Sequence, residues 1–227
     1  MQTVRLGRTD ALVSVAGLGC GGHSRLGMAR GASEGEAARV VEHAIAAGVT
    51  FIDTARSYGT EGAVGRALAG KDRTALFLST KSWVGEAGSE KHPRLLTAAE
   101  FTANLDASLR TLGTDYIDLF HLHGVSADQW PHARDVIVPE LHRQQALGKV
   151  RFIGLTEVFR FDTAHTMLAD ALPSGLIDVV MVGFNLLNQT ARAKVFPVTR
   201  KLDLGTLIMF AVRRGLNSAE HAAEAVA

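Results

Sequence analysis

Four ionisable side chains, Asp53, Tyr58, Lys81 and His123, have types that together suit proton donation. Each comes after a short run rich in apolar, β-branched and aromatic residues, which is the pattern of a buried strand. The runs are residues 49–52 before Asp53 and Tyr58, residues 76–80 before Lys81, and residues 116–122 before His123. The sequence therefore predicts that three successive strands end in ionisable residues that share one site.

These residue types can assist the reduction of a carbonyl group. A tyrosine is a poor acid at neutral pH because its reference pKa is about 10. A neighbouring ammonium lowers that pKa, and a carboxylate beside the ammonium keeps it charged and fixed in place. We expect Lys81 and Asp53 to serve Tyr58 in this way, with Tyr58 as the general acid. The imidazole of His123 would donate a hydrogen bond to the carbonyl oxygen. Taken singly, Asp53 would be a helix cap, Tyr58 a packing residue and Lys81 a surface lysine.

The sequence resembles the aldo-keto reductase family over about residues 1–215, through an ordered set of short strings. The resemblance implies that Asp53, Tyr58, Lys81 and His123 form the catalytic tetrad. It also implies that hydride comes from NADPH or, less often, NADH, and that the partner is a small carbonyl compound. The matching strings are LGRT at 6–9, GLG at 17–19, FIDTA at 51–55, YG at 58–59, TK at 80–81, SL at 108–109, DYIDL at 115–119, His123, and GKVRFIG at 148–154.

The resemblance further implies a nicotinamide pocket, in which this sequence departs from the family. Thr156 and Glu157 stand where the family commonly has Ser-Asn, so Thr156 would donate one hydrogen bond and Glu157 would weaken the carboxamide contacts. Met181 replaces a common glutamine, Asn185 matches a frequent asparagine, and Phe210 stands where an aromatic ring often stacks on the nicotinamide. The predicted cofactor contacts are Gly21, Asp53, Thr156, Glu157, Asn185 and Phe210.

Three features near these residues have more than one interpretation. The glycine cluster at residues 17–22 indicates a flexible strand-end loop near the cofactor. His121 is expected to be a hydrogen-bonded interior histidine; a zinc pair with His123 is the alternative, although two histidines make a weak metal signal and we predict no metal. Arg213 and Arg214 suit either a phosphate contact or solvated surface charge.

The elements that must position these residues alternate between strand and helix patterns. Capping boxes formed by Ser33 with Glu36 and by Thr97 with Glu100 mark the starts of two helices, which end at Gly48 and Gly113. The resemblance implies a hairpin over about residues 3–14. Strands are expected near residues 15–19, 49–52, 76–80, 116–122, 150–155, 177–182 and 206–210, with further helices over about 62–68, 134–147, 162–171 and 189–201.

Alternating strands and helices predict an α/β fold with a parallel sheet. No Gly-x-Gly-x-x-Gly turn follows the first strand, and the βα repeat favours a TIM-type (β/α)8 barrel over a doubly wound sheet. We count about seven strands, so we expect an incomplete barrel domain over residues 1–227 that lacks the last βα unit. Its open edge would favour self-association. Two functions follow: a carbonyl reductase, or an impaired family member that acts as a binding or regulatory protein.

Composition agrees with a cytoplasmic enzyme. The 227 residues are 47% hydrophobic, which suffices for a large core. The net charge is +1, from 24 basic and 23 acidic side chains, which argues against nucleic acid or anionic membrane as partners. The sequence has no apolar signal region and no run of 18 apolar residues. Cys20 is the only cysteine, so an internal disulfide is excluded.

Overall fold

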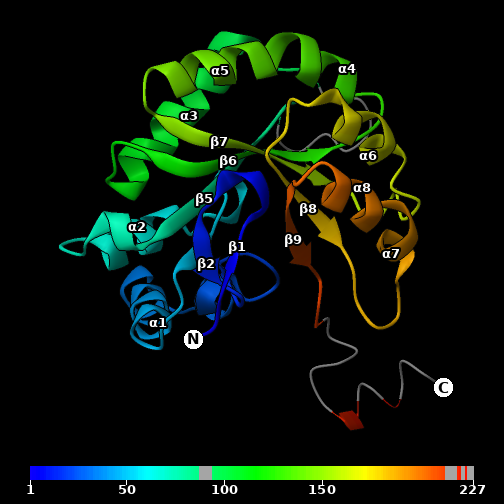
Figure 1. Ribbon diagram of the computed structural model, residues 1–227. Coiled ribbons are helices and arrows are strands. Elements are labelled where there is room, and N and C mark those ends of the chain that lie inside the picture. The colour runs from blue at the N-terminus through cyan, green and yellow to red at the C-terminus, as the bar shows by residue number, and fades with distance from the viewer. Residues whose placement is uncertain (87–93, 213–218, 221–222, 224–227) are drawn as a thin grey trace.

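The computed structural model describes residues 1–86, 94–212, 219, 220 and 223, and its centre is a parallel sheet. The seven strands follow the order β3-β4-β5-β6-β7-β8-β9, so each strand pairs with the next one along the chain. Together they form a curled half-barrel, which confirms the prediction of an incomplete TIM-type barrel (Figure 1). The strands are β3 (Leu18–Gly19), β4 (Phe51–Asp53), β5 (Phe77–Trp83), β6 (Ile117–Val125), β7 (Val150–Glu157), β8 (Val179–Gly183) and β9 (Gly205–Met209).

Helices surround the outer face of this sheet (Figure 1). A short π-helical turn, Ala133–Ile137, joins two of them, α4 and α5. Within the described ranges, no helix is long and apolar enough to cross a membrane. The helices are α1 (Glu34–Ala46), α2 (Glu61–Leu68), α3 (Ala98–Leu112), α4 (Trp130–His132), α5 (Val138–Ala146), α6 (Thr166–Ala171), α7 (Thr190–Lys194) and α8 (Phe196–Lys201).

Both predicted capping boxes are present. The Ser33 hydroxyl accepts the backbone N–H of Glu36, whose side chain accepts the Ser33 N–H in return, and α1 begins there. Thr97 and Glu100 make the same pair of bonds at the start of α3. Gly113 ends α3 with a φ of 63°, a left-handed conformation that glycine adopts without strain. These two helices are therefore set by local sequence.

An antiparallel hairpin closes the end of the half-barrel at which the strands begin. Its strands are β1 (Thr3–Arg5) and β2 (Leu12–Ser14), as the resemblance implied. Leu6 and Val13 of this segment belong to an apolar cluster with the first residues of several barrel strands. Within it, Phe77 stacks between Phe51 at 5.3 Å and Phe152 at 6.3 Å. This cluster fills the end of the half-barrel at which the strands begin, so that the opposite ends of the strands remain available for functional residues.

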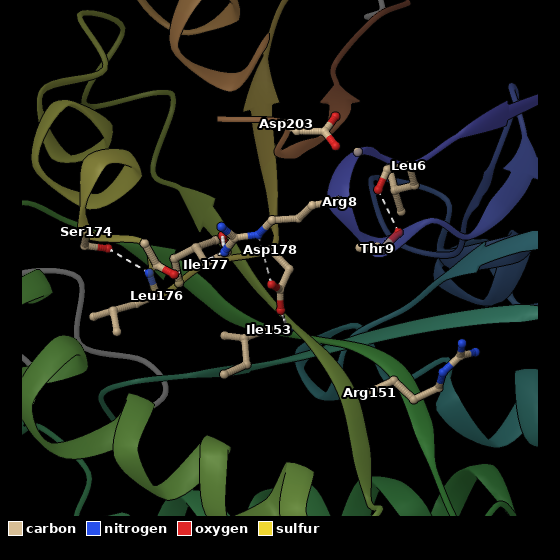
Figure 2. A network of polar contacts seen from close by, with 12 residues as sticks. Leu6, Arg8, Thr9, Arg151, Ile153, Ser174, Leu176, Ile177, Asp178 and Asp203 are labelled. Atoms are coloured by element: carbon tan, nitrogen blue, oxygen red, sulfur yellow. Dashed lines mark hydrogen bonds and ion pairs between the residues drawn. The ribbon is translucent and has the colours of Figure 1, made fainter. Parts of the chain in front are cut away.

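Hydrogen bonds and an ion pair connect the segment between the hairpin strands to the sheet (Figure 2). The Arg8 guanidinium donates through Nε to Asp178 Oδ1 at 3.2 Å and through Nη2 to the carbonyls of Gly175 and Ile177. The second carboxylate oxygen of Asp178 accepts the Ile153 N–H at 2.9 Å. The arginine thus links a segment near the N-terminus to the start of β8. This network is structural and lies at the end away from the tetrad.

Some predicted boundaries are wrong for identifiable reasons. The expected helix over 189–201 is broken into α7 and α8, because Pro197 lacks the N–H that a continuous helix needs. The expected helix over 162–171 begins only at Thr166, since the Asp162 carboxylate accepts the N–H groups of Thr166 and Met167 and caps it from outside. The strand expected at 15–19 is reduced to Leu18–Gly19.

Candidate active site

The four predicted catalytic residues meet at the ends of β4, β5 and β6. Asp53 is the last residue of β4, and Tyr58 ends the short helical turn Arg56–Tyr58 that follows it. Lys81 and His123 lie inside β5 and β6, not after them as predicted. The β5–β6 ladder runs on through Trp83, which pairs with His123. Backbone pairing therefore continues past the apolar runs that marked the strands in the sequence.

Lys81 and Asp53 form a buried ion pair. Lys81 Nζ lies 2.6 Å from Asp53 Oδ2 and also donates to the Thr54 carbonyl at 2.8 Å. The second carboxylate oxygen accepts the Ser79 hydroxyl at 2.9 Å. Lys81 is fully buried, and such a charge is tolerated only where it is paired and hydrogen-bonded. Burial lowers the Lys81 pKa, but Asp53 and Tyr58 together raise it above its usual value.

Tyr58 lies beside this ion pair. The Lys81 ammonium is 4.9 Å from the centre of the phenol ring. Gly21 packs against the ring so closely that a Cβ there would stand 2.5 Å from Cε2. Burial raises the pKa of Tyr58, while the charge of Lys81 lowers it, and the net direction is upward. The expected net lowering is therefore wrong, because desolvation of the phenolate outweighs the nearby ammonium.

His123 completes the group as a neutral imidazole. Its ring meets the Tyr58 ring edge-on at 5.6 Å and the Trp83 ring at 5.9 Å. Nδ1 lies 3.5 Å from the Ser57 hydroxyl. Burial and the charge of Lys81 lower the pKa of His123 to about 3. Near neutral pH the ring therefore carries one N–H, which it can donate to an oxygen atom between Tyr58 and Trp83.

His121 lies inside the barrel, but the prediction of a hydrogen-bonded histidine is wrong. Neither ring nitrogen has a partner of normal hydrogen-bond geometry in the described ranges, and the Leu155 backbone gives only a weak contact. The ring packs on Gly154, where a Cβ would collide with it. Burial, together with Lys81 and His123, keeps the His121 pKa well below its usual value. The described residues also contain no cluster of three potential metal ligands.

Thr156 and Glu157, the predicted carboxamide contacts, end β7. The Thr156 hydroxyl oxygen accepts the Gly124 N–H at 2.6 Å. Both carboxylate oxygens of Glu157 are engaged: Oε1 accepts the Gly183 N–H at 2.9 Å, and Oε2 lies 2.8 Å from His165 Nδ1. Burial raises the Glu157 pKa, although the bonds from Gly183 and His165 oppose this. Glu157 is therefore engaged by contacts within the protein.

Asn185 and Phe210 lie beyond β8 and β9. Asn185 Oδ1 accepts two backbone N–H groups of its own loop, and Nδ2 donates to the Phe210 carbonyl at 3.3 Å. This links the loop after β8 to the end of β9. The Phe210 side chain is 39% exposed, and its ring lies 6.1 Å from that of Phe159. Arg213 and Arg214 are outside the described residues.

Comparisons with known proteins agree with this geometry. Residues 18–225 match the model of the Aldo/keto reductase family. The chain belongs to this family. It is 27% identical over 219 residues to the L-galactose dehydrogenase of Arabidopsis thaliana, a match that covers 93% of this chain and 65% of that protein. Members of the family are in general oxidoreductases that use nicotinamide cofactors on small carbonyl compounds.

Solved aldo-keto reductases share the fold. The holo form of AKR11C1 from Bacillus halodurans superposes with a TM-score of 0.75 at 27% identity, covering 92% of this chain and 65% of that one. A Klebsiella pneumoniae aldo/keto reductase in complex with NADP and acetate has a TM-score of 0.65 at 24% identity, covering 90% and 66% respectively. The present aldo/keto reductase chain thus spans 65% of the length of the Arabidopsis and Bacillus proteins.

Two residues that contact the candidate site, Ser79 and His165, were not among those predicted from the sequence of this aldo/keto reductase chain. Ser79 supports Asp53, and its signal was available, because it lies two residues before Lys81 and so faces the same side of β5. His165 joins Glu157 to the Thr190 hydroxyl, which lies 2.9 Å from Nε2. No pattern marked His165, since its partners lie eight and 25 residues away in sequence.

Proposed function

We propose that this chain reduces the carbonyl group of a small aldehyde or ketone, with Tyr58 as the general acid and NADPH as the preferred cofactor, NADH being the alternative. The observation that supports this most is the buried Lys81–Asp53 ion pair, at 2.6 Å, next to the Tyr58 ring. A buried ammonium has one clear use here, which is to stabilise the phenolate that remains after Tyr58 gives up its proton. When bound, the nicotinamide supplies hydride to the carbonyl carbon.

The chain's own residues fit such a cofactor. Phe210 offers a partly exposed aromatic ring, braced by Phe159, on which a flat ring can stack. The Thr156 oxygen accepts the Gly124 N–H, and no acceptor for its own proton is found in the described ranges. That proton can be donated to a carboxamide oxygen. We assign Glu157 no direct contact with the cofactor, because His165 and the Gly183 N–H occupy its carboxylate.

Proton movements follow from the geometry of the tetrad. The neutral His123 donates its N–H to the carbonyl oxygen and orients it between Tyr58 and Trp83. Tyr58 transfers its phenolic proton to that oxygen as negative charge develops there. Lys81 stabilises the resulting phenolate, and Asp53 keeps Lys81 charged and in place. Solvent then returns a proton to Tyr58.

Isotope transfer tests this proposal. The protein is incubated with nitrobenzaldehyde and NADPH that carries deuterium at both positions of the reactive carbon of its nicotinamide ring. We expect the nitrobenzyl alcohol product to contain one deuterium on the carbinol carbon, as detected by mass spectrometry. Absence of alcohol, or alcohol without deuterium, would refute hydride transfer from the nicotinamide.

A second candidate function is binding without turnover, by an impaired family member that acts as a binding or regulatory protein. Within the described residues, β3 and β9 are the two ends of the sheet and pair with no further strand, which favours a partner at an edge. The same incubation separates the two functions. A binding protein yields no labelled alcohol, whether or not it quenches the fluorescence emission of NADPH. We further propose a cytoplasmic location, because the only cysteine, Cys20, is a buried free thiol.

A further inference from the structure

The ladder between β6 and β7 is irregular at the active site. Pairing is regular up to Leu122 and resumes at Val125, so His123 and Gly124 of β6 stand opposite Thr156 of β7 alone. Two residues opposite one is the count of a β-bulge, which bends its strand and changes the direction of the side chains there. The bulge therefore coincides with one of the four proposed catalytic residues.

Thr156 accepts a hydrogen bond from the backbone of this bulge. Gly124 has a φ of 57°, a left-handed conformation that glycine adopts without strain. Its N–H cannot reach the regular ladder and donates instead to the Thr156 hydroxyl oxygen at 2.6 Å. The bond is part-buried, and Thr156 itself is only 2% exposed. The bond thus joins β7 to the residue that directly follows His123.

The His123 side chain is held only weakly by its own contacts. Within the described part of the chain, its one polar contact, from Nδ1 to the Ser57 hydroxyl, is 3.5 Å long and at the limit of a hydrogen bond. The Tyr58 and Trp83 rings meet it edge-on, with ring centres 5.6 and 5.9 Å away. Its orientation therefore depends on the backbone, which is fixed by β5 on one side and by Thr156 on the other.

We propose that Thr156 is a positioning residue, whose hydroxyl fixes His123 through the Gly124 N–H in the β6 bulge. This role is separate from donation of the Thr156 proton to a cofactor, because it uses the oxygen lone pair. The catalytic consequence rests on the proposed carbonyl reduction. The structural consequence does not, and it can be measured without turnover.

Three variants separate the positioning role of the Thr156 hydroxyl from other effects of substitution. Thr156→Val removes the hydroxyl and keeps the β-branched shape, whereas Thr156→Ser keeps the hydroxyl. Thr199→Val is the matched control, because Thr199 is also buried, at 3% exposure, and its hydroxyl bonds a carbonyl within α8, at 3.2 Å. Amide-proton NMR of each folded variant then reports on Gly124, and the carbon-bound ring protons report on His123.

In the NMR measurement, Thr156→Val should move the Gly124 amide proton upfield and speed its exchange with solvent by on the order of tenfold, the effect of losing one hydrogen bond. The His123 ring protons should shift as well. Thr156→Ser should restore both signals, and Thr199→Val should leave them in place. Unchanged Gly124 and His123 signals in Thr156→Val would overturn the proposal.

In the kinetic measurement with nitrobenzaldehyde and NADPH, Thr156→Val should lower kcat by up to about a hundredfold, the usual effect of misplacing a catalytic group. KM for NADPH should rise by no more than about tenfold, the effect of losing one hydrogen bond to the carboxamide, and Thr156→Ser should recover most of kcat. A loss confined to the KM for NADPH would make Thr156 a cofactor ligand alone and contradict the proposal. If the wild-type protein shows no turnover, the proposed function fails, while the NMR result still decides the positioning role.

Discussion

At the scale of single residues, the site depends on one charge that is costly to bury. The Lys81 ammonium has no exposure and is compensated by the Asp53 carboxylate, which is itself bonded to Ser79. Breaking a buried ion pair leaves one charge uncompensated, whereas an exposed pair contributes little. The stability of the fold and the chemistry of Tyr58 therefore share the same two side chains.

Lys81→Met should lower the free energy of unfolding by about 3–5 kcal/mol, because it leaves the Asp53 carboxylate buried without its partner. It should also raise the pKa of Tyr58 further, since Lys81 lowers it. Urea denaturation measures the first effect, and tyrosinate absorbance measures the second. Lys149→Met is the control, because Lys149 pairs with Asp106 at 2.7 Å with both side chains about one third exposed. Equal losses in the two variants would contradict this account.

The two histidines of β6 should make the fold sensitive to acid. Burial and Lys81 lower the pKa of His123 from 6.5 to about 3, and the His121 pKa is also well lowered. Between pH 6.5 and about pH 3, the unfolded chain therefore binds more protons than the folded chain does. Stability is therefore fully present above about pH 6.5 and is lost as the pH falls toward the folded-state pKa, by up to about 1.4 kcal/mol per pH unit for each histidine.

His123→Gln should flatten this dependence, and urea denaturation at a series of pH values between neutral and mildly acidic checks it. His142→Gln serves as the control, because His142 lies on the exposed face of α5. A pH dependence that His123→Gln leaves as steep as in the wild-type protein would show that His123 does not titrate as described.

At the scale of elements, the parts governed by neighbouring residues could be predicted from sequence. The capping boxes at Ser33 and Thr97 fixed the starts of α1 and α3, because each box is complete within four residues. The ends of β5 and β6 could not be predicted from neighbouring residues in the same way. Lys81 and His123 are poor strand formers by pattern, and only pairing with neighbouring strands extends the strands through them.

Side-chain partners distant in sequence were also beyond prediction. Glu157 was expected to disturb a carboxamide, and the sequence offered no sign that His165 and the Gly183 N–H would engage its carboxylate. The same holds for Thr156, since its contact with Gly124 exists only because a bulge brings them together. Residue types and order therefore selected four residues that lie close together, whereas the contacts of Glu157 and Thr156 depend on tertiary structure.

His165→Leu should destabilise the segment between β7 and α6. It removes the hydrogen-bond partner of the buried Glu157 Oε2, which should lower the free energy of unfolding by about 1–3 kcal/mol. Glu157→Gln in the same chain removes the unpaired charge, so the double variant should lose less than the sum of the single variants. Thermal denaturation of all four proteins measures this coupling, and strict additivity would argue against it.

At the scale of the whole molecule, the half-barrel has two sheet ends, β3 and β9, with no further strand beside them in the described ranges. Ile208 of β9 is 42% exposed, and Val212 just beyond it is 69% exposed. Strand edges with exposed apolar side chains tend to pair with other chains. We therefore expect self-association through the β9 edge.

Light scattering over a range of protein concentrations should show a mass that rises from monomer to dimer. Ile208→Lys should suppress this rise, because a lysine on an edge strand opposes pairing. Leu147→Lys is the control, since Leu147 is 58% exposed after α5, away from both edges. A constant monomer mass in the wild-type protein would contradict association through the edge.

The reductase proposal is tested most directly by comparing the wild-type chain with Tyr58→Phe in NADPH binding and in nitrobenzaldehyde reduction. The substitution removes only the phenolic oxygen, so quenching of tryptophan fluorescence should give the same NADPH Kd for both proteins within about twofold. Turnover should fall by about 10²–10⁴-fold, the usual effect of removing a general acid. Wild-type turnover that survives in Tyr58→Phe, or wild-type protein that does not bind NADPH, would contradict the assignment of this site.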